Sequence, residues 1–590
     1  MSWMQIAPGT RERARGRRGY PYVRPASVQW GDRSAAWSVF LILISIYSGT
    51  FSGLPDIPDA EVEFQTTSAL VRTGALALGG TPEARAITSA GFGVAPGGPQ
   101  REGRLYSRYG VGQALVGVPF YVVGRAFALL WPDIERQHAQ SEAYGYPRSE
   151  YFAHLLVGWR NPLLGALTGM LVVTTARRLG VRRRLAWLCG LSYGLCTYAW
   201  PQARSTLSDV QATFLLFAGF HLLVKARECF ARLGPPPAHV LIGAGLALGG
   251  AVLTRVAVIP AVLVLAVAAW QVLALGHGLL ERAWGASEPG APHSRTIQAL
   301  EVFLPLVASF ALLLVLNQLR FGTPVHTGYE TSVDLRTFFS GAPQLGLAGL
   351  LISPGRGLFW MAPGLLLLPL GLRHAVRSGE RLWSWTLAGL ALAVLVPAAC
   401  LRGWHGAWTY GPRYALPLLP VAWLGLGLAL EADWKRTWMR WATSAVCLLG
   451  LVVQIGGALV DHTTHTDLSL QAARLEWPDE PELGSAEQEA RRFERIQWDW
   501  RFAAPWAHWR ILRQRVAGLG ETFSARAIYF TARAGALVPT HERSLGFRHI
   551  AWVDFHERLG GSSWPAVLVS ILLGAAGTVL GLRAVDPAAS

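Results

Sequence analysis

Two aspartates lie where apolar segments of this sequence end or begin, and their chemistry bears most on what the chain does. Asp59 follows the first apolar segment, and Asp209 opens a later one. Three further acids accompany Asp59: Asp56, Glu61 and Glu63. Charges at or inside a bilayer are costly, so acids in such positions are candidates for function. Each aspartate could instead cap the helix that starts beside it, and the sequence leaves both roles open.

Four arginines lie at the edges of apolar segments on the same predicted side: Arg204, Arg255, Arg356 and Arg413. This side is predicted to be the outer one, where arginines next to spans are disfavoured, so an anionic partner is expected. The arginines could tie the fold together through acids and helix carbonyls. They could also bind the phosphate of a lipid-linked substrate, for which a guanidinium is a bidentate donor. A single arginine fits the first role better, whereas the set beside two acids favours phosphate binding.

Acids and arginines at one membrane face suit the transfer of a sugar from a lipid phosphate. A carboxylate can act as general base on an acceptor hydroxyl. Arginines stabilise the charge that develops on the departing phosphate. An inverting transfer requires a base, an acceptor, and a leaving group on the opposite face of the sugar from the acceptor. Tyr109 and His405 are further candidates for contacting substrate, although aromatic residues are also common at membrane interfaces.

Metal and nucleotide chemistry have weaker signals. His462 and His465, between Asp461 and Asp467, have metal-ligand types and spacing, but HxxH in a loop is not specific. No required metal is predicted, and a divalent ion stays possible. The sequence contains no phosphate-binding loop of the GxxxxGK type and no HExxH motif. Its net charge of +16 comes from basic clusters between apolar segments, so lipid rather than nucleic acid is the expected partner.

The composition is that of a membrane protein. Hydrophobic residues make up 52% of the 590 residues and charged residues 15%, against about 25% in soluble proteins. A span needs about 20 mostly apolar residues. Twelve spans are predicted, near 35–52, 151–176, 185–200, 207–224, 237–254, 257–276, 300–318, 357–372, 383–401, 413–430, 438–460 and 564–583.

Basic residues in alternate loops place both chain ends on the cytoplasmic side, with a long outer loop at 53–150. In this topology the apolar stretch 111–131 is an interfacial or re-entrant helix, and a thirteenth span is the alternative. Residues 60–78 fit an amphipathic helix along the membrane. The predicted divisions are a basic tail at 1–34, a transmembrane core at 35–460, an outer region at 461–563 and a final span with a short tail at 564–590.

The order of motifs resembles a family of membrane enzymes. It comprises the acidic PDAEVEF after the first span, RLYSRYGVGQALVGVPFYVVG, ARSTLSDVQATFLL, FGTPVHTGY, LLISPGRGLFWMAPG and WTYGPRYALPLLP. Together they resemble the GT-C membrane glycosyltransferases, particularly the branch of protein O-mannosyltransferases and aminoarabinose transferases. The resemblance covers about residues 35–460, and its motifs are short and degenerate.

This resemblance implies a polyprenyl-phosphate sugar as donor and inverting transfer to a glycan, lipid or protein at the outer face of the plasma membrane. By this resemblance, Asp59 would be the catalytic base, and Asp209 would match the second acidic position of the family. Arg356 and Arg413 are our inference for the donor phosphate. The runner-up is a transporter or flippase of a polyprenyl-linked glycan, for which charges near mid-membrane and pseudo-symmetric halves are expected.

Overall fold

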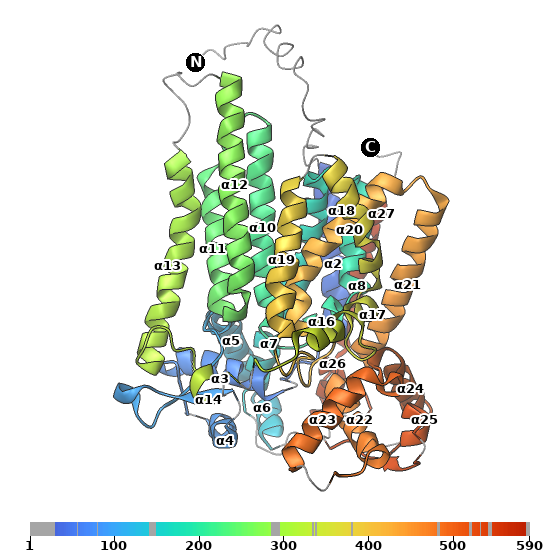
Figure 1. The fold of residues 1–590 in the computed structure, drawn as a ribbon. Coiled ribbons are helices and arrows are strands. Elements are labelled where there is room, and N and C mark those ends of the chain that lie inside the picture. The colour runs from blue at the N-terminus through green and yellow to red at the C-terminus, as the bar shows by residue number, and fades with distance from the viewer. Residues whose placement is uncertain are drawn as a thin grey trace.

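The computed structural model describes residues 30–585 except positions 56, 80, 92, 141–148, 285–294, 333–335, 337–338, 379–380, 481–483, 519–521, 532 and 541–545. Most of this part of the chain is helical, and its long helices lie side by side in one bundle (Figure 1). Asp56 and most of the predicted basic tail fall outside the described residues.

Each of the twelve predicted spans coincides with helical structure. The bundle contains α2 (Trp30–Gly49), α7 (Tyr151–Arg178), α8 (Arg183–Leu195), α10 (Asp209–Ala231), α11 (Ala238–Thr254), α12 (Ile259–Trp284), α13 (Arg295–Phe321), α18 (Leu368–Arg377), α19 (Arg381–Ala399), α20 (Leu419–Asp433), α21 (Thr437–Leu459) and α27 (Trp564–Val585). By length and composition, eight helices in the described residues can cross a membrane. The predicted fold class, an all-helical multi-pass membrane protein, is confirmed, and the count of twelve stays a prediction.

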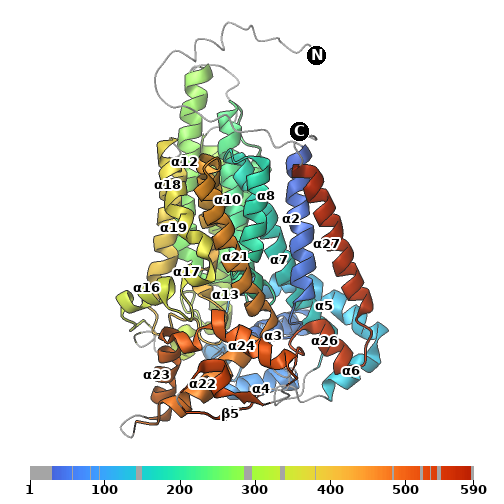
Figure 2. The same cartoon turned by 90° about the vertical axis from the view of Figure 1, so that its right-hand side faces the viewer.

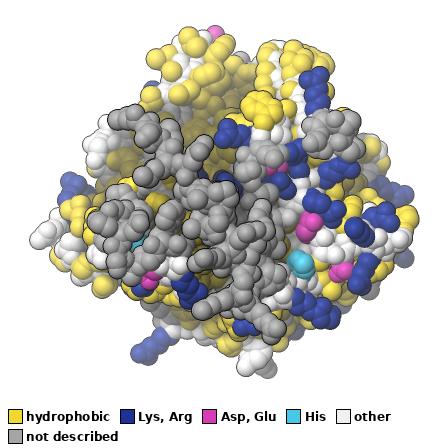
Figure 3. Space-filling model, turned by 90° about the horizontal axis from the view of Figure 1, so that it is seen from above, with side chains coloured by type: hydrophobic (Ala, Val, Ile, Leu, Met, Phe, Trp, Pro, Cys, Tyr) yellow, Lys and Arg dark blue, Asp and Glu magenta, His cyan; other side chains and the backbone are white. Residues whose placement is uncertain are grey.

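The two ends of the bundle differ in what they carry. At the terminal end, where α2 begins and α27 finishes, Asp32 is buried between Arg177 at 2.8 Å and Arg183 at 2.9 Å. Arg183 also donates to the carbonyl of Ala584, which joins the last helix to the first. Lys and Arg predominate among the charged side chains visible on this end (Figure 3). This distribution is what the predicted cytoplasmic side requires.

The Asp32 cluster gives a prediction about stability. Asp32→Asn leaves two largely buried guanidinium groups without their carboxylate, and we expect a loss of about 3 kcal/mol in the free energy of unfolding. Thermal unfolding of the detergent-purified chain measures it. Asp433→Asn is the matched control, because its partner Arg436 is 65% exposed and such pairs contribute less than about 1 kcal/mol. Equal stability of the two variants would contradict this assignment.

The opposite, loop end carries the elements of the first loop and the region after α21 (Figures 1 and 2). The first loop contains α3 (Pro58–Thr73), α4 (Pro82–Ala90), α5 (Gly112–Leu130), α6 (Pro132–Ala139) and a small antiparallel sheet of β1 (Ala77–Leu78), β3 (Leu105–Ser107) and β2 (Val94–Pro96). Helix α3 begins at Pro58, whose fixed φ suits a first helical position, and ends at Gly74, which is left-handed at φ 66°. A helix therefore exists in the predicted place, but it ends at Thr73 rather than near residue 78, and residues 60–68 are buried on all sides rather than along one face.

Helix α5 contains the apolar stretch whose placement the sequence left open. It is long and apolar enough to span a membrane. It lies at the loop end with α3 and α6 rather than along the full length of the bundle (Figures 1 and 2). The interfacial placement of α5 stays a prediction that this arrangement favours.

The region after α21 packs around a core of its own. It comprises α22 (His462–Glu476), α23 (Ser485–Trp498), α24 (Ala504–Val516), α25 (Ala525–Tyr529), α26 (Ala551–Glu557) and the strand pair β4 (Phe523–Ser524) and β5 (Ala536–Leu537). Leu468, Phe502 and Ile511 are buried in this separate core, whereas Phe555 of α26 packs with Leu54 and Tyr151. Asp461 begins the region by capping α22, accepting from the backbone N–H of Thr464.

Candidate functional site

The two aspartates each contact an arginine at the loop end. Asp209 is 2% exposed, and its Oδ1 lies 2.6 Å from Nη1 of Arg255. Asp59 is looser: its side chain is 26% exposed, and its Oδ2 lies 3.8 Å from Nη2 of Arg413. Both arginines approach the ring of Tyr414, with guanidinium carbons 5.6 and 5.2 Å from its centroid. We call these five residues the acid–arginine cluster.

Neither aspartate serves as a helix cap. The N-cap of α3 is Ile57 and that of α10 is Ser208, and neither cap makes a side-chain capping bond. Asp59 and Asp209 occupy the first helical turns, where the helix dipole favours a negative charge. Their carboxylates therefore pair with arginines and do not cap the helices.

A tyrosine–arginine segment borders the cluster. Tyr109 lies beside Asp59, and burial followed by the charge of Asp59 raises the pKa of its hydroxyl well above the usual value. The Arg108 guanidinium lies 5.4 Å from the ring of Tyr109 and 5.1 Å from that of Tyr329. Arg320 donates to the carbonyls of Ser107 and Tyr109, so the end of α13 fixes this segment.

Two glycines bring this segment against the end of α11, next to Arg255. A Cβ at Gly110 would lie 2.3 Å from the carbonyl oxygen of Leu253, and one at Gly112 would lie 2.6 Å from the backbone nitrogen of Thr254. Gln211 of α10 completes the junction, donating to the carbonyl of Gly112 and to the Thr254 hydroxyl. Close backbone approach thus holds the segment of Tyr109 against the turn that carries Arg255.

Glu63 is a third acid near the cluster. It is 4% exposed, and burial, opposed in part by a hydrogen bond from Ser208 and the charge of Arg160, raises its pKa to about 8. The nearby carboxylates of Asp209 and Asp59 raise its pKa further. Glu63 therefore holds a proton at neutral pH, which spares the site a third negative charge.

This proton makes stability depend on pH. The folded state binds the Glu63 proton up to about pH 8, whereas the model carboxyl loses it near 4.5, so the free energy of unfolding falls as pH rises between these values. Glu63→Gln mimics the protonated form and should remove that part of the slope, leaving the variant more stable than wild type at pH 8 and similar at pH 4.5. Thermal unfolding across this range measures it, and parallel profiles of variant and wild type would refute the raised pKa.

Other residues predicted from sequence lie apart from the cluster. Arg356 is 1% exposed and donates to the carbonyls of Thr409, Gly411 and Ala407. His405 packs against Phe493, with ring centroids 4.7 Å apart. The structure thus gives Arg356 a role in holding the loop before Arg413, and no contact in the described residues joins it to either aspartate.

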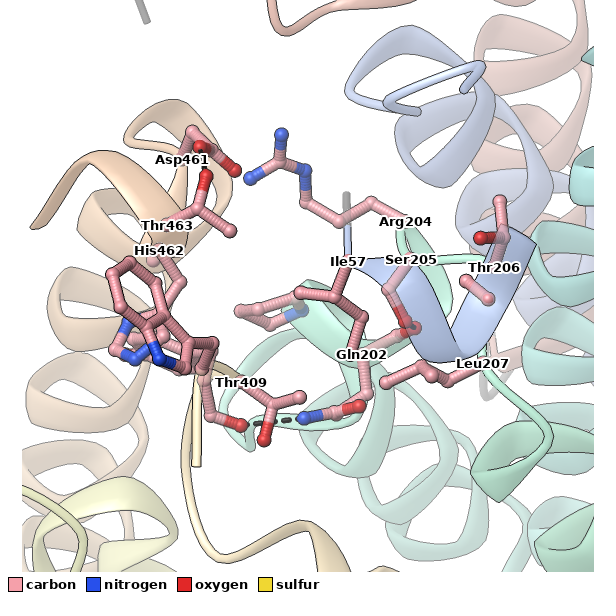
Figure 4. Close-up of a pocket in the computed structure, with 15 residues that line it drawn as sticks. Ile57, Gln202, Arg204, Ser205, Thr206, Leu207, Thr409, Asp461, His462 and Thr463 are labelled. Atoms are coloured by element: carbon pink, nitrogen blue, oxygen red, sulfur yellow. Dashed lines mark hydrogen bonds between the residues drawn. The ribbon is translucent and has the colours of Figure 1, made fainter. Parts of the chain in front are cut away.

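Glu61 and Arg204 also contact residues that do not belong to the acid–arginine cluster. Glu61 is fully buried and contacts Gln65 at 2.7 Å and the ring of His154 at 3.1 Å, so it packs α3 against α7. Arg204 is 4% exposed and donates from Nε to the carbonyl of Thr50 at 3.2 Å. It lines a cavity together with Gln202 and Asp461 (Figure 4).

The donor groups present do not favour a divalent cation. Asp59 and Asp209 each face a guanidinium. Among the described residues, His462, His465 and His508 bring ligand atoms within 4.8 Å of one another. Arg356 Nη2 lies 3.0 Å from Nε2 of His462, and since arginine only donates, this nitrogen accepts and the proton of the neutral ring is on Nδ1. A protonated nitrogen is no metal ligand, and the other nitrogen of His462 is occupied by Arg356, so this ring does not favour a metal.

Several site residues escaped the sequence reasoning. Arg108, Tyr329 and Tyr414 join the cluster as neighbours of residues that were noted. Arg160 lies inside a predicted span, is fully buried, and donates to the carbonyl of Gln113. A charge within an apolar segment was the available signal for Arg160.

Comparisons with known proteins show a resemblance over part of the chain. Residues 145–320 match the family model of dolichyl-phosphate-mannose-protein mannosyltransferases. No curated protein sequence matches the chain.

Three solved structures were found at low similarity. The Archaeoglobus fulgidus oligosaccharyltransferase without ligand is 12% identical, with a TM-score of 0.38, covering 75% of this chain. This chain spans 58% of that protein's length. ArnT from Cupriavidus metallidurans without ligand is 15% identical, with a TM-score of 0.41 and coverage of 92% of this chain and 75% of ArnT. ArnT bound to undecaprenyl phosphate is also 15% identical, with a TM-score of 0.37 and coverage of 95% and 78%.

These TM-scores are too low to establish the fold, which therefore rests on the helices of the chain itself. The family match begins before α7 and ends near the end of α13, so it includes Asp209 and Arg255 but neither Asp59 nor Arg413. Over residues 145–320, less than half of the chain, it resembles the dolichyl-phosphate-mannose-protein mannosyltransferases, and the resemblance predicted from the sequence is confirmed for these residues.

Proposed function

We propose that the chain is an inverting glycosyltransferase that moves a sugar from a polyprenyl phosphate to an envelope acceptor. The observation that carries the proposal is the acid–arginine cluster, in which Asp59 and Asp209 meet Arg413 and Arg255 around one tyrosine ring. The match to a family named for a dolichyl-phosphate sugar supports this class of donor.

The two aspartates suit different roles because their surroundings differ. Asp59 is partly exposed and only loosely paired, so it can approach an acceptor hydroxyl and take its proton. Asp209 is buried and held at 2.6 Å by Arg255, so it positions that guanidinium. We therefore assign Asp59 as the base and Asp209 as a positioning residue.

The reaction balances with these groups. As Asp59 accepts the hydroxyl proton, the acceptor oxygen bonds to the anomeric carbon of the sugar. The bond from that carbon to the phosphate oxygen breaks, and its electron pair leaves with the phosphate. Arg413 and Arg255 stabilise the added negative charge. Attack and departure on opposite faces invert the anomeric centre.

The loop end is proposed to face outside the cytoplasm, because Lys and Arg predominate among the charged side chains visible on the terminal end (Figure 3). The direct test is transfer of radiolabelled sugar from a polyprenyl-phosphate donor in membranes that contain the chain, compared with membranes that lack it. Donor-dependent labelling of a glycan, lipid or protein fraction supports the proposal. Movement of the intact donor across the bilayer without transfer would favour a flippase instead.

A further inference from the structure

An open groove lies at the loop end between α23 and α16 (Pro343–Ile352). Helix α23 lies beyond α16, on the side away from the long helices of the bundle (Figures 1 and 2). The groove is lined by Trp477, Trp498 and Trp500, by two arginines and two acids, and by Leu345 of α16. Its volume is about 690 Å³, within the range of about 300–1,000 Å³ that is usual for ligand sites. We call it the tryptophan groove.

One face of α23 forms the polar wall of the tryptophan groove. Glu494, Arg495 and Trp498 follow Arg491 by three, four and seven residues, which is the spacing of a single helical face. Arg491 and Arg495 each lie 3.3 Å from the carboxylate of Glu480, so one acid holds both guanidinium groups. Arg491, Glu494 and Arg495 are exposed, so their polar groups can reach a ligand in the groove.

Neighbouring rings hold two of the indoles in place. Trp498 packs against Trp404, with ring centroids 5.9 Å apart, and Trp500 packs against Trp360 at 4.9 Å. The indole N–H of Trp360 in turn donates to the carbonyl of Ile352 at 3.0 Å. Trp500 is still 50% exposed, so part of its ring is open to solvent. Side chains that are already fixed lose little freedom when a ligand binds.

The chemistry of this lining decides the class of ligand. Two arginines and two acids balance in charge, and both arginines already face Glu480, so an anion gains no net attraction. An extended peptide pairs with the open backbone groups of a strand edge, whereas this wall is a helix. Guanidinium groups donate and carboxylates accept, so together they match sugar hydroxyls, which do both. The C–H face of a sugar ring packs on the negative face of an indole.

We propose that the tryptophan groove binds a neutral glycan, with sugar rings against Trp498 and Trp500 and hydroxyl groups on Glu494 and Arg495. The inference goes beyond the proposed function, because a glycan can bind here whether or not the acid–arginine cluster transfers sugar.

The tryptophan groove is joined through side chains to the loop that leads to the acid–arginine cluster. Gln497, the neighbour of Trp498, accepts a hydrogen bond from Nε of Arg356 at 3.1 Å. Arg356 also donates to the carbonyl of Gly411, in the loop before Arg413. A glycan in the groove is therefore held at the same end of the chain as the cluster.

Trp500→Ala tests the aromatic part of the tryptophan groove. Because Trp500 is half exposed, we expect the variant to fold. Its affinity for a glycan should fall about 2- to 10-fold, as the loss of one ring contact predicts. Trp506→Ala is the matched control, because Trp506 lies in the same region, is 38% exposed and is not among the residues that line the groove.

Glu494→Gln tests the polar part with almost no change in shape. Replacing the charged acceptor by an amide should also lower the affinity about 2- to 10-fold. Because Glu494 is exposed, this variant should be as stable as wild type. Glu489→Gln is its control, because Glu489 belongs to the same helix but pairs with Arg474 and is not among the residues that line the groove.

The probes are the neutral trisaccharides maltotriose, cellotriose and mannotriose at millimolar concentration. They are titrated into the full chain in phosphatidylcholine nanodiscs, because maltoside detergents carry a sugar of their own. Isothermal titration calorimetry measures binding, and no sugar donor is present, so the result does not depend on transfer. We expect at least one trisaccharide to bind wild type and both control variants alike, and to bind Trp500→Ala and Glu494→Gln more weakly.

Two kinds of result would overturn the proposal. If a trisaccharide binds all variants equally, its site lies elsewhere in the chain. If no trisaccharide binds, the tryptophan groove is no glycan site, and other probes show what it holds instead. Binding of inorganic phosphate or of a serine-rich peptide that Trp500→Ala weakens would then assign it to an anion or a peptide. Quenching of tryptophan fluorescence by brominated phosphatidylcholine that Trp500→Ala reduces would assign it to lipid.

Discussion

Asp59→Asn is expected to reduce sugar transfer from a polyprenyl-phosphate donor by about 10²- to 10⁴-fold, the usual contribution of a general base. Asparagine has the shape of aspartate but cannot take up the acceptor proton. The substitution should cost less than about 1 kcal/mol of stability, because the Asp59–Arg413 pair is 3.8 Å long and partly exposed. Initial rates in membranes, normalised to the amount of folded protein, measure the effect.

Asp133→Asn is the matched control for this experiment. Asp133 is an acid of the same loop whose side chain is 77% exposed and pairs with the exposed Arg136. This variant should transfer sugar at the wild-type rate. Wild-type transfer by a folded Asp59→Asn protein would remove Asp59 from the role of base.

Arg255→Gln is expected to cost about 3–5 kcal/mol of stability, because it leaves the buried carboxylate of Asp209 without its partner. Arg255→Lys keeps the charge and should recover most of this loss. It should still weaken donor binding, since an ammonium cannot reproduce the two-point grip of a guanidinium on phosphate. Loss of one charge-assisted hydrogen bond corresponds to about 1.5–3 kcal/mol, or roughly a 10- to 150-fold rise in the KM for donor.

The comparison of these two variants separates structure from binding. Arg182→Gln serves as control, because its pair with Glu431 is half exposed at the terminal end and should contribute less than about 1 kcal/mol. If Arg255→Lys folds and has the wild-type KM for donor, Arg255 only neutralises Asp209 and does not contact the phosphate.

The positions of the helices could be predicted because apolar length is written directly in the sequence. Whether each helix runs without interruption could not be predicted. The predicted span 357–372 is divided into α17 (Leu358–Met361), a 3₁₀ turn η3 (Pro363–Leu367) and α18, and Pro363 and Pro369 lie within it. Proline lacks the N–H that continues a helix, and how the chain recovers after it depends on packing against other helices. A hydropathy pattern does not contain that information.

The site was predictable in its residue types and only partly in its partners. Acids and arginines at span edges were visible, and the prediction that Asp59 and Asp209 share one end agrees with the contacts around Tyr414. Which arginine meets which acid depends on how distant helices pack. Arg356 and Arg413 look alike in sequence, yet carbonyls surround Arg356 while Arg413 approaches Asp59.

The central claim is that the acid–arginine cluster holds the phosphate of a polyprenyl-linked donor. An experimental structure of the full chain with bound polyprenyl phosphate tests it most directly. We expect phosphate oxygens within hydrogen-bond distance of Arg255 or Arg413, with the carboxylate of Asp59 facing the side from which an acceptor would approach. A phosphate bound away from both arginines, or at the terminal end, would contradict the account.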